Sequence, residues 1–402
     1  MNPLAAVKST DVLKTVEADA GQMKQIWTIF RLRKWIGEGK SVSVAKLLHL
    51  SCQSQATHAK DKVYGILGMA EDHHHIAPDY SKSTTATEIF LRTARILLRR
   101  QEADHLLVLQ KAGIGYEGRT ANLPSWVPDW ANPPEPYPLA RGFVGEEAAD
   151  RYHASRGMRP VTALETGTNM IKLSGLYIDT VVAVTEVLSG DLDTNKESGA
   201  AEAVYWLMTA RNLAMHDPMI KRRYSYDLNA CFWRTLVGDR WKTMRPLLTP
   251  VVRSCDAWKS KIIQIGDLAD EVQGYDFGTD IRDDPRENFP PNFDLSWLYP
   301  PADQFSYAIL WNIKFYLFEN MMREASFRRK LALTKNGYMA LLPPGGTIGD
   351  ILYLIAEAET PFALRQDRDT GIYQLVGEAY VHGVMDGERA AQGDVPEELL
   401  VR

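Results

Sequence analysis

The segment from Phe305 to Met322 places the strongest constraint on how this chain of 402 residues folds. Its large apolar side chains recur at helical spacing and form two neighbouring stripes. The stripes comprise Phe305, Ile309, Ile313, Tyr316 and Leu317 on one side, and Trp311, Phe315, Phe318 and Met322 on the other. Because two adjacent stripes cover most of a helix's circumference, they predict a helix at 303–325 that is buried in the middle of the molecule.

The rest of the chain mixes helix and strand signals. Helical patterns occur in residues 11–70, after a capping box formed by Thr85 and Glu88, and again at 198–214 and 226–240. Strand patterns occur at 105–110, at 171–187, and in the short apolar runs between glycine turns at 329–387.

We therefore predict an α+β fold. It has a mainly helical body, a short central β segment and a C-terminal small antiparallel β-sheet or barrel. Three regions follow from the pattern, either as closely packed subdomains or as one domain. They are a helical region at 1–140 that ends in the LPSWVPDW loop, a mixed β and helical region at 141–328, and an antiparallel β subdomain at 329–402.

Composition excludes several classes of protein. The net charge of −5 leaves no basic surplus for binding nucleic acid. The three cysteines are far apart and unpaired in spacing, which indicates neither a disulfide framework nor a zinc site and favours a reduced, cytoplasmic setting. The most apolar stretch, SYAILWNIKFYLF, is interrupted by Asn312 and Lys314, so we expect no membrane span. The N-terminal MNPLAAVKSTDVLK is broken by Lys8, Asp11 and Lys14, so we expect no signal peptide.

Four motifs resemble known sites but lack the required context. GIGYEG at 113–118 matches a dinucleotide fingerprint, yet Pro124 forbids the helix that would bind the pyrophosphate, so we expect a turn. Three consecutive histidines at 73–75 cannot all face one ion from a regular element, so we expect a solvated loop and no metal. PPGGTIGD lacks the lysine of a phosphate loop and predicts a turn before a strand at Ile351. No motif for a covalent hydrolase occurs.

Aromatic side chains lie beside carboxylates in three places. The sequence pairs Asp79 with Tyr80, sets Asp129 between tryptophans in LPSWVPDW, and spaces Glu378, Tyr380 and His382 so that a regular strand presents them on one face. One interpretation is structural, in which these groups cap loops and bridge subdomains. The other makes them the donors and acids of an aromatic-walled pocket.

Five motifs in order give the chain a family resemblance. They are AKDKVYGILGMA, IAPDYSKS, LPSWVPDW, CFWRTLVGD, and the C-terminal run from GYMALLPPGGTIGD to YQLVGEAYVHGVMDGE. Over about residues 56–390 the chain resembles the fungal heterokaryon-incompatibility (HET) domain family. Its first motif departs from the pattern, since Ala59 and Lys60 stand where relatives carry Pro-Arg.

A larger departure lies at the N-terminal side. Typical members begin with a core that resembles the Toll/interleukin-receptor fold, marked by Ser-Tyr-x-Trp-Gly and Trp-Ile-Asp…Cys-Ile-Asn-Gln, and neither string occurs here. The chain thus resembles a truncated member of the type found in fungal natural-product gene clusters. The missing core argues against the NAD-cleaving activity that it supports elsewhere.

The resemblance implies a cofactor-independent cyclase of the Diels–Alder type that acts on a small apolar polycyclic terpenoid or polyketide. Such a reaction needs a shaped cavity and hydrogen-bond donors, and no cofactor. The expected donors and acids are Tyr80, Asp129, Tyr380 and His382, and the expected wall residues are Trp126, Trp130, Tyr307, Trp311 and Phe315. The alternative is a non-enzymatic incompatibility module that binds another protein. The sequence leaves the oligomeric state open.

Overall fold

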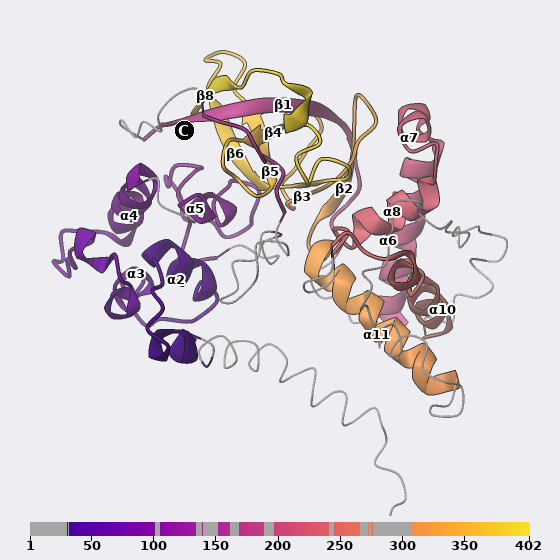
Figure 1. Ribbon diagram of the computed structural model, residues 1–402, viewed down its shortest axis with the longest axis horizontal. Coiled ribbons are helices and arrows are strands. Elements are labelled where there is room, and N and C mark those ends of the chain that lie inside the picture. Colours follow the sequence, from indigo (N-terminus) through magenta and orange to yellow (C-terminus); the bar gives the residue numbers. More distant parts are fainter. Residues whose placement is uncertain are drawn as a thin grey trace, which may run out of the picture. The chain divides into compact units, whose positions relative to one another are not determined.

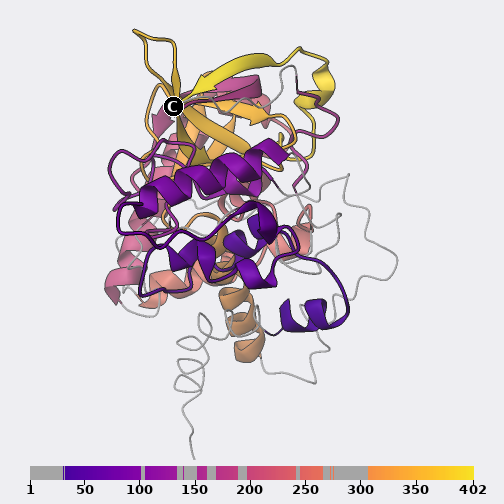
Figure 2. The same cartoon turned by 90° about the vertical axis from the view of Figure 1, so that its left-hand side faces the viewer.

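The computed structural model describes residues 30, 32–100, 105–133, 139, 152–160, 169–188, 197–240, 245–265, 272, 275 and 307–402 (Figure 1, Figure 2). The chain divides into two compact units. The first comprises Met1–Leu107 with Gly142–Glu146, and the second comprises Val108–Arg141 with Glu147–Arg402.

The first unit is helical in its described part. Its α-helices include α2 (Val44–Leu50), α3 (Asp61–Tyr64) and α4 (Ala86–Arg100), with single 3-10 turns at Leu67–Met69 and His73–His75. The capping box predicted for α4 is confirmed, because the Thr85 amide donates to the Glu88 carboxylate at 2.7 Å and the Glu88 amide donates to the Thr85 hydroxyl at 3.2 Å. Ile89, Phe90 and Leu98 of α4 are buried.

Helix α5 (Leu107–Gln110) begins where the first unit ends, and it corrects the strand predicted at 105–110. A short apolar run has the same composition in a buried helix as in a strand, so periodicity alone does not separate them.

The helices of the second unit form one apolar cluster. They are α6 (Glu197–His216), α7 (Pro218–Arg223), α8 (Leu228–Leu236), α9 (Thr249–Val252), α10 (Cys255–Ile265) and α11 (Tyr307–Ala325). The predicted long helix is confirmed as α11, whose described side chains Phe315, Phe318 and Met322 are buried among the neighbouring helices. Trp233 of α8 and Trp258 of α10 both lie with ring centroids 5.7 Å from that of Phe318.

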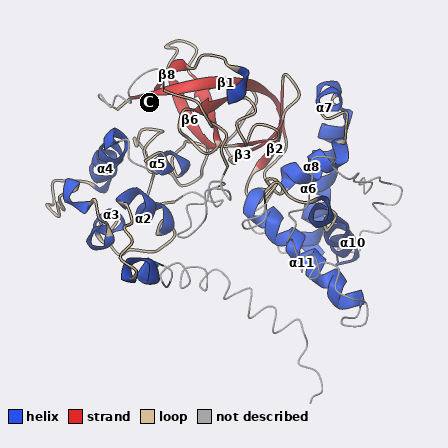
Figure 3. Ribbon diagram, in the orientation of Figure 1, coloured by secondary structure: helices blue, strands red, loops and turns tan. Residues whose placement is uncertain are grey.

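Eight strands form one sheet in the described part of the chain (Figure 3). They are β1 (Ile171–Val184), β2 (Lys330–Thr334), β3 (Met339–Leu342), β4 (Ile351–Ile355), β5 (Pro361–Gln366), β6 (Tyr373–Glu378), β7 (Tyr380–Val381) and β8 (Glu397–Val401). The strand predicted to start at Ile351 is confirmed.

The sheet closes on itself through β1. This strand of 14 residues pairs with β8 along its first part, with β4 in its middle, and with β2 at its end. Strands β4, β5, β6 and β8 follow one another and return to β1, so the ring is complete. On the other side, β2 pairs with β3, and β3 pairs with β7, which follows β6 after Ala379. The result is a small barrel.

Alternation along the strands separates two apolar faces. Leu331 and Leu333 of β2, with Met339 and Leu341 of β3, belong to the cluster that contains the helices. The intervening residues, such as Ala332 and Ala340, belong to a second cluster with residues of the other barrel strands. The helical layer therefore packs on the β2–β3 face of the barrel.

Two parts of the predicted fold class need correction. An α+β fold is confirmed, but the sheet is larger than predicted and is not confined to the C-terminal region. The segment predicted as a short central β segment is the long strand β1, which belongs to the same sheet. The pairing is antiparallel except between β6 and β8, which are parallel and share a single residue pair, Tyr373 with Val401. Strand β8 was not predicted.

Gly175 lies at the point where β1 passes from β8 to β4. A Cβ there overlaps Cδ1 of Leu399 and lies 2.9 Å from its Cγ and 3.2 Å from Cδ1 of Tyr353. We predict that Gly175→Ala lowers the free energy of unfolding by about 1–3 kcal/mol through overpacking, measured by urea denaturation. Gly68→Ala is the control, because a Cβ at Gly68 meets nothing within 4 Å. Equal effects of the two substitutions would contradict the prediction.

Candidate functional site

Tyr80 lies in the first unit, where two of the motifs meet. Its hydroxyl donates to Asp61 at 2.7 Å, and its ring lies 5.3 Å from that of Tyr64. This hydrogen bond raises the pKa of Tyr80. The neighbouring Asp79 accepts hydrogen bonds from the Thr84 hydroxyl and the Ser81 amide, which lower the pKa of Asp79 to about 2. AKDKVYGILGMA and IAPDYSKS are thus joined by these bonds.

The LPSWVPDW loop joins two strands of the barrel. Ser125 donates from its amide and its hydroxyl to the carbonyl of Arg402, and its hydroxyl accepts from the Leu375 amide at 2.9 Å. Leu375 belongs to β6 and Arg402 follows β8, so Ser125 bridges the two strands that share only one residue pair. The indole of Trp126, which is fully buried, donates to the Asn169 carbonyl at 3.0 Å.

Asp129 organises this loop from within. Its buried carboxylate accepts from the amides of Thr120, Ala131 and Asn132 at 2.7, 3.2 and 3.2 Å. Arg119 completes the arrangement by donating to the carbonyls of Leu123, Pro124 and Val127. Trp130 is buried at 3% exposure.

The glycines of GIGYEG pack against the barrel. The amides of Ile114 and Gly115 donate to the carbonyls of Leu375 and Val376, both at 2.9 Å, so the segment covers β6. A Cβ at Gly115 would lie 2.7 Å from the Val376 oxygen. The segment is therefore a close backbone packing site on the barrel, and no helix follows it to hold a phosphate.

The three expected wall residues on α11 are described to different extents. Phe315 is buried at 1% exposure within the helical cluster. Tyr307 and Trp311 belong to the helix, but their side chains lie outside the described part of the chain.

Tyr380 and His382 line a pocket of about 320 Å³ between the helical layer and the barrel of the second unit. The pocket is partly open, and its other lining residues come from the end of α7, from α8 and the segment after it, and from the turn after β7. Trp126, Asp129, Trp130 and Phe315 are not among them. Its wall includes three arginines, two aspartates and several tyrosines, so it is more polar than the aromatic cavity predicted from the sequence.

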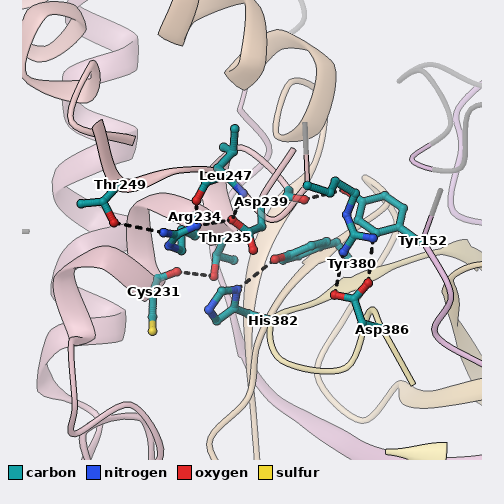
Figure 4. A network of polar contacts seen from close by, with 12 residues as sticks. Tyr152, Cys231, Arg234, Thr235, Asp239, Leu247, Thr249, Tyr380, His382 and Asp386 are labelled. Atoms are coloured by element: carbon teal, nitrogen blue, oxygen red, sulfur yellow. Dashed lines mark hydrogen bonds and ion pairs between the residues drawn. The ribbon is translucent and has the colours of Figure 1, made fainter. Parts of the chain in front are cut away.

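Three rings form one corner of the pocket, and Figure 4 shows two of them, Tyr380 and His382. The Tyr380 hydroxyl and His382 Nδ1 are 2.9 Å apart, and the Tyr224 hydroxyl donates to the His382 carbonyl at 3.1 Å. The Tyr224 and His382 rings lie 5.5 Å apart. Burial raises the pKa of the Tyr380 phenol well above its ordinary value, and it also raises the pKa of Tyr224. Both phenols therefore remain neutral at physiological pH.

The second wall comes from the CFWRTLVGD motif. Arg234 donates to Asp239 at 2.7 Å and to the Leu247 carbonyl, and it lies 3.4 Å from the Thr249 hydroxyl. Asp239 also accepts from the Leu247 amide at 3.1 Å. Arg234 and Asp239 are the first and last charged residues of the motif, so the resemblance pointed to this segment, although neither was predicted as a site residue.

The third wall is formed by Arg245, whose guanidinium stacks on the ring of Tyr152. Arg245 donates to both carboxylate oxygens of Asp386, at 2.8 and 3.0 Å, and its guanidinium lies 4.1 Å from the centre of the Tyr152 ring. Burial works against the charge of Arg245, but Tyr152 and Asp386 outweigh it, and the pKa of Arg245 is raised. Sequence reasoning missed this pair, since its partners are 141 positions apart.

The described part of the chain contains no group of three or more His, Cys, Asp or Glu side chains arranged to hold a metal ion. His73, His74 and His75 are exposed on a 3-10 turn. Among the described helices, none combines the length and apolar character needed to cross a bilayer.

The bridge made by Ser125 is testable. We predict that Ser125→Ala lowers the free energy of unfolding by about 1–3 kcal/mol, because it leaves the buried Leu375 amide without its acceptor. Thr209→Ala is the control, since the exposed Thr209 hydroxyl donates only within its own helix, to Tyr205. Chemical denaturation measures both. A loss for Ser125→Ala no larger than that for Thr209→Ala would argue against the bridge.

The cysteine thiols of the helical layer are predicted to be unreactive. Burial raises the pKa of Cys231 to about 12 and that of Cys255 well above its ordinary value. At pH 8 the thiolate fraction of Cys231 is then roughly one in ten thousand, and only the thiolate reacts rapidly with an alkylating agent. Mass spectrometry after iodoacetamide treatment should show both residues unmodified in the folded protein and modified in guanidinium chloride. Rapid labelling of folded protein would contradict this.

Comparison with known proteins agrees with the motifs. Residues 307–401, which span α11 and strands β2 to β8, match the Het-6 beta-barrel domain. The chain is 25% identical over 366 residues to "Heterokaryon incompatibility protein 6, OR allele" of Neurospora crassa. The alignment covers 86% of this chain and 51% of that protein, so the chain spans about half the length of its curated relative. No solved structure matches the chain. Residues 307–401 are thus similar to a Het-6 beta-barrel domain, and most of the chain is similar to part of a fungal heterokaryon incompatibility protein.

Proposed function

We propose that the protein is a cofactor-independent cyclase of fungal natural-product biosynthesis, acting in the cytoplasm on a small terpenoid or polyketide. The observation that carries the proposal is the pocket of about 320 Å³ whose corner holds the hydrogen-bonded Tyr380 and His382. Both residues were expected donors, and they come from a two-residue strand and the turn after it.

The fixed positions of these groups suit a pericyclic reaction. Such a reaction forms its bonds in one step once the substrate is folded, so the protein contributes mainly shape and orientation. A donor aimed at a carbonyl of the dienophile lowers the barrier further, because charge accumulates on that oxygen in the transition state. The Tyr380 phenol stays protonated, since burial raises its pKa, and it is held in place by His382 and by β7.

The charged wall changes the substrate that we propose. An apolar polycyclic molecule without oxygen functions would displace water from the exposed parts of the arginine and aspartate groups of this pocket and would offer them no hydrogen bond in its place. We therefore propose a substrate that carries several oxygen atoms, at least one of them the carbonyl that Tyr380 contacts.

A second candidate function is a non-enzymatic incompatibility module that binds another protein. The name of the curated relative, a heterokaryon incompatibility protein, favours it. Under this alternative the chain, when expressed in a compatible pair of strains, provokes growth arrest on hyphal fusion, and substitutions in the pocket leave that response intact.

The cyclase proposal predicts a specific loss in Tyr380→Phe. Purified protein should accelerate cyclisation of a diene-bearing precursor with an activated carbonyl, and Tyr380→Phe should lower kcat/KM by about a hundredfold, the typical effect of losing one such donor. Product formation is followed by liquid chromatography with mass spectrometry.

Tyr353→Phe is the matched control. It also removes one buried phenol oxygen, which bonds to Tyr373 and Glu397 and does not line the pocket. This variant should retain full activity. Absence of acceleration across a panel of pathway precursors, or an equal loss in the two variants, would overturn the proposal.

A further inference from the structure

Arg245 is held by the protein in a position that requires an anion beside it. Its side chain is 4% exposed, and the guanidinium lies 4.1 Å from the centre of the Tyr152 ring, which is itself buried. Because the guanidinium has already lost most of its water, an anion must face its hydrogen-bond donors if the buried charge is not to destabilise the fold. In this structure that anion is the Asp386 carboxylate.

Asp386 differs from Arg245 in its exposure. Its side chain is 50% exposed, and it lies in the turn that follows β7, between Gly383 and Gly387, both of which have positive φ. Among the described residues, its carboxylate accepts hydrogen bonds from Arg245, and its amide donates to Glu388 at 2.8 Å. Releasing the Asp386 carboxylate into water therefore costs little, because it is half solvated already.

The two halves of this ion pair are thus unequal. The cation is buried and fixed against an aromatic ring, and the anion is exposed on a turn. An incoming carboxylate that takes the place of Asp386 receives the same two parallel hydrogen bonds, and the guanidinium needs no further loss of water.

The other arginines of the pocket do not have this arrangement. Arg234 donates to Asp239 and to the Leu247 carbonyl, and the Asp239 side chain is only 15% exposed, so this pair is part of the wall. Arg223 lies 3.6 Å from the centre of the Tyr338 ring and donates to the Asn336 carbonyl.

We propose that the pocket binds a ligand that carries a carboxylate, and that this carboxylate displaces Asp386 from Arg245. Asp386 then serves as an internal substitute that keeps Arg245 neutralised when no ligand is bound. The proposal rests on the ligand-binding role of the pocket given above, and it adds that the carbonyl-bearing ligand is also an acid.

Benzoate is a suitable probe because it presents a planar carboxylate on an apolar ring. Benzamide has nearly the same shape without the charge. Isothermal titration calorimetry on the full chain should show weak binding of benzoate to the wild type and binding at least tenfold tighter to Asp386→Asn, since the competing carboxylate has been removed. Benzamide should show no such gain.

Glu388→Gln is the matched control for electrostatics. It removes one negative charge from the same turn and the same pocket, but among the described residues Glu388 makes no ion pair with Arg245. Its affinity for benzoate should stay within twofold of the wild type. Adding Arg245→Lys to the Asp386→Asn protein keeps the positive charge but removes the paired donors. This double variant should bind benzoate at least tenfold more weakly than Asp386→Asn alone.

Equal gains in Asp386→Asn and Glu388→Gln would overturn the proposal, since the effect would then come from net charge alone. A gain for benzamide equal to that for benzoate would overturn it as well. The readout is separate from catalysis. Benzoate binding with the predicted pattern but no turnover of any precursor rejects the cyclase and retains the carboxylate site, whereas turnover without that pattern rejects the carboxylate site alone.

Discussion

The pairing of β1 with three other strands is the constraint on which the second unit depends. One strand of 14 residues pairs with β8, β4 and β2 in turn, with one register shift between Tyr177 and Asp179 inside the β4 pairing and another between Val181 and Ala183 inside the β2 pairing. Such shifts bend a strand and increase its twist, which lets a single segment turn around a small barrel. Gly175, at the point where β1 passes from β8 to β4, leaves the space that the side chain of Leu399 fills. The Het-6 beta-barrel match begins at residue 307, so the barrel of this chain is completed by a strand that lies well before the matched segment.

The closed ring has one weak junction, and the tryptophan loop strengthens it. Strands β6 and β8 are parallel neighbours with one residue pair, which leaves backbone groups of β6 to be satisfied by other segments. Ser125 bonds to both strands, and residues 114 and 115 bond to β6 beside it. The prolines and buried indoles of LPSWVPDW hold Ser125 in place, which gives the rigid loop a structural role in the barrel. Tyr380 and His382 extend from the same barrel, so the geometry of the pocket depends indirectly on this junction.

Features set by neighbouring residues were predictable, and features set by distant ones were not. The capping box of Thr85 and Glu88 and the long helix α11 follow from local spacing, and the structure confirms both. The run before Lys111 was misassigned because four apolar residues suit a helix or a strand equally. Strand β8, with two glutamates at its start, carries no clear strand signal and forms because β1 is there to pair with it. The Arg245–Asp386 pair joins positions 141 apart, and no spacing rule reaches that far.

The position of β1 also has a consequence for biosynthesis. The bonds that seal the barrel join residues as far apart as Ser125 and Arg402, which are separated by 277 positions. At a translation rate of roughly 5–20 residues per second, the earliest segments of the barrel wait on the order of ten seconds or more for their last partner. During that interval the longest strand has unpaired edges, the feature that most readily recruits other chains. The yield of folded protein in a cell therefore depends on what shelters this strand while the ribosome completes the helices and the remaining strands.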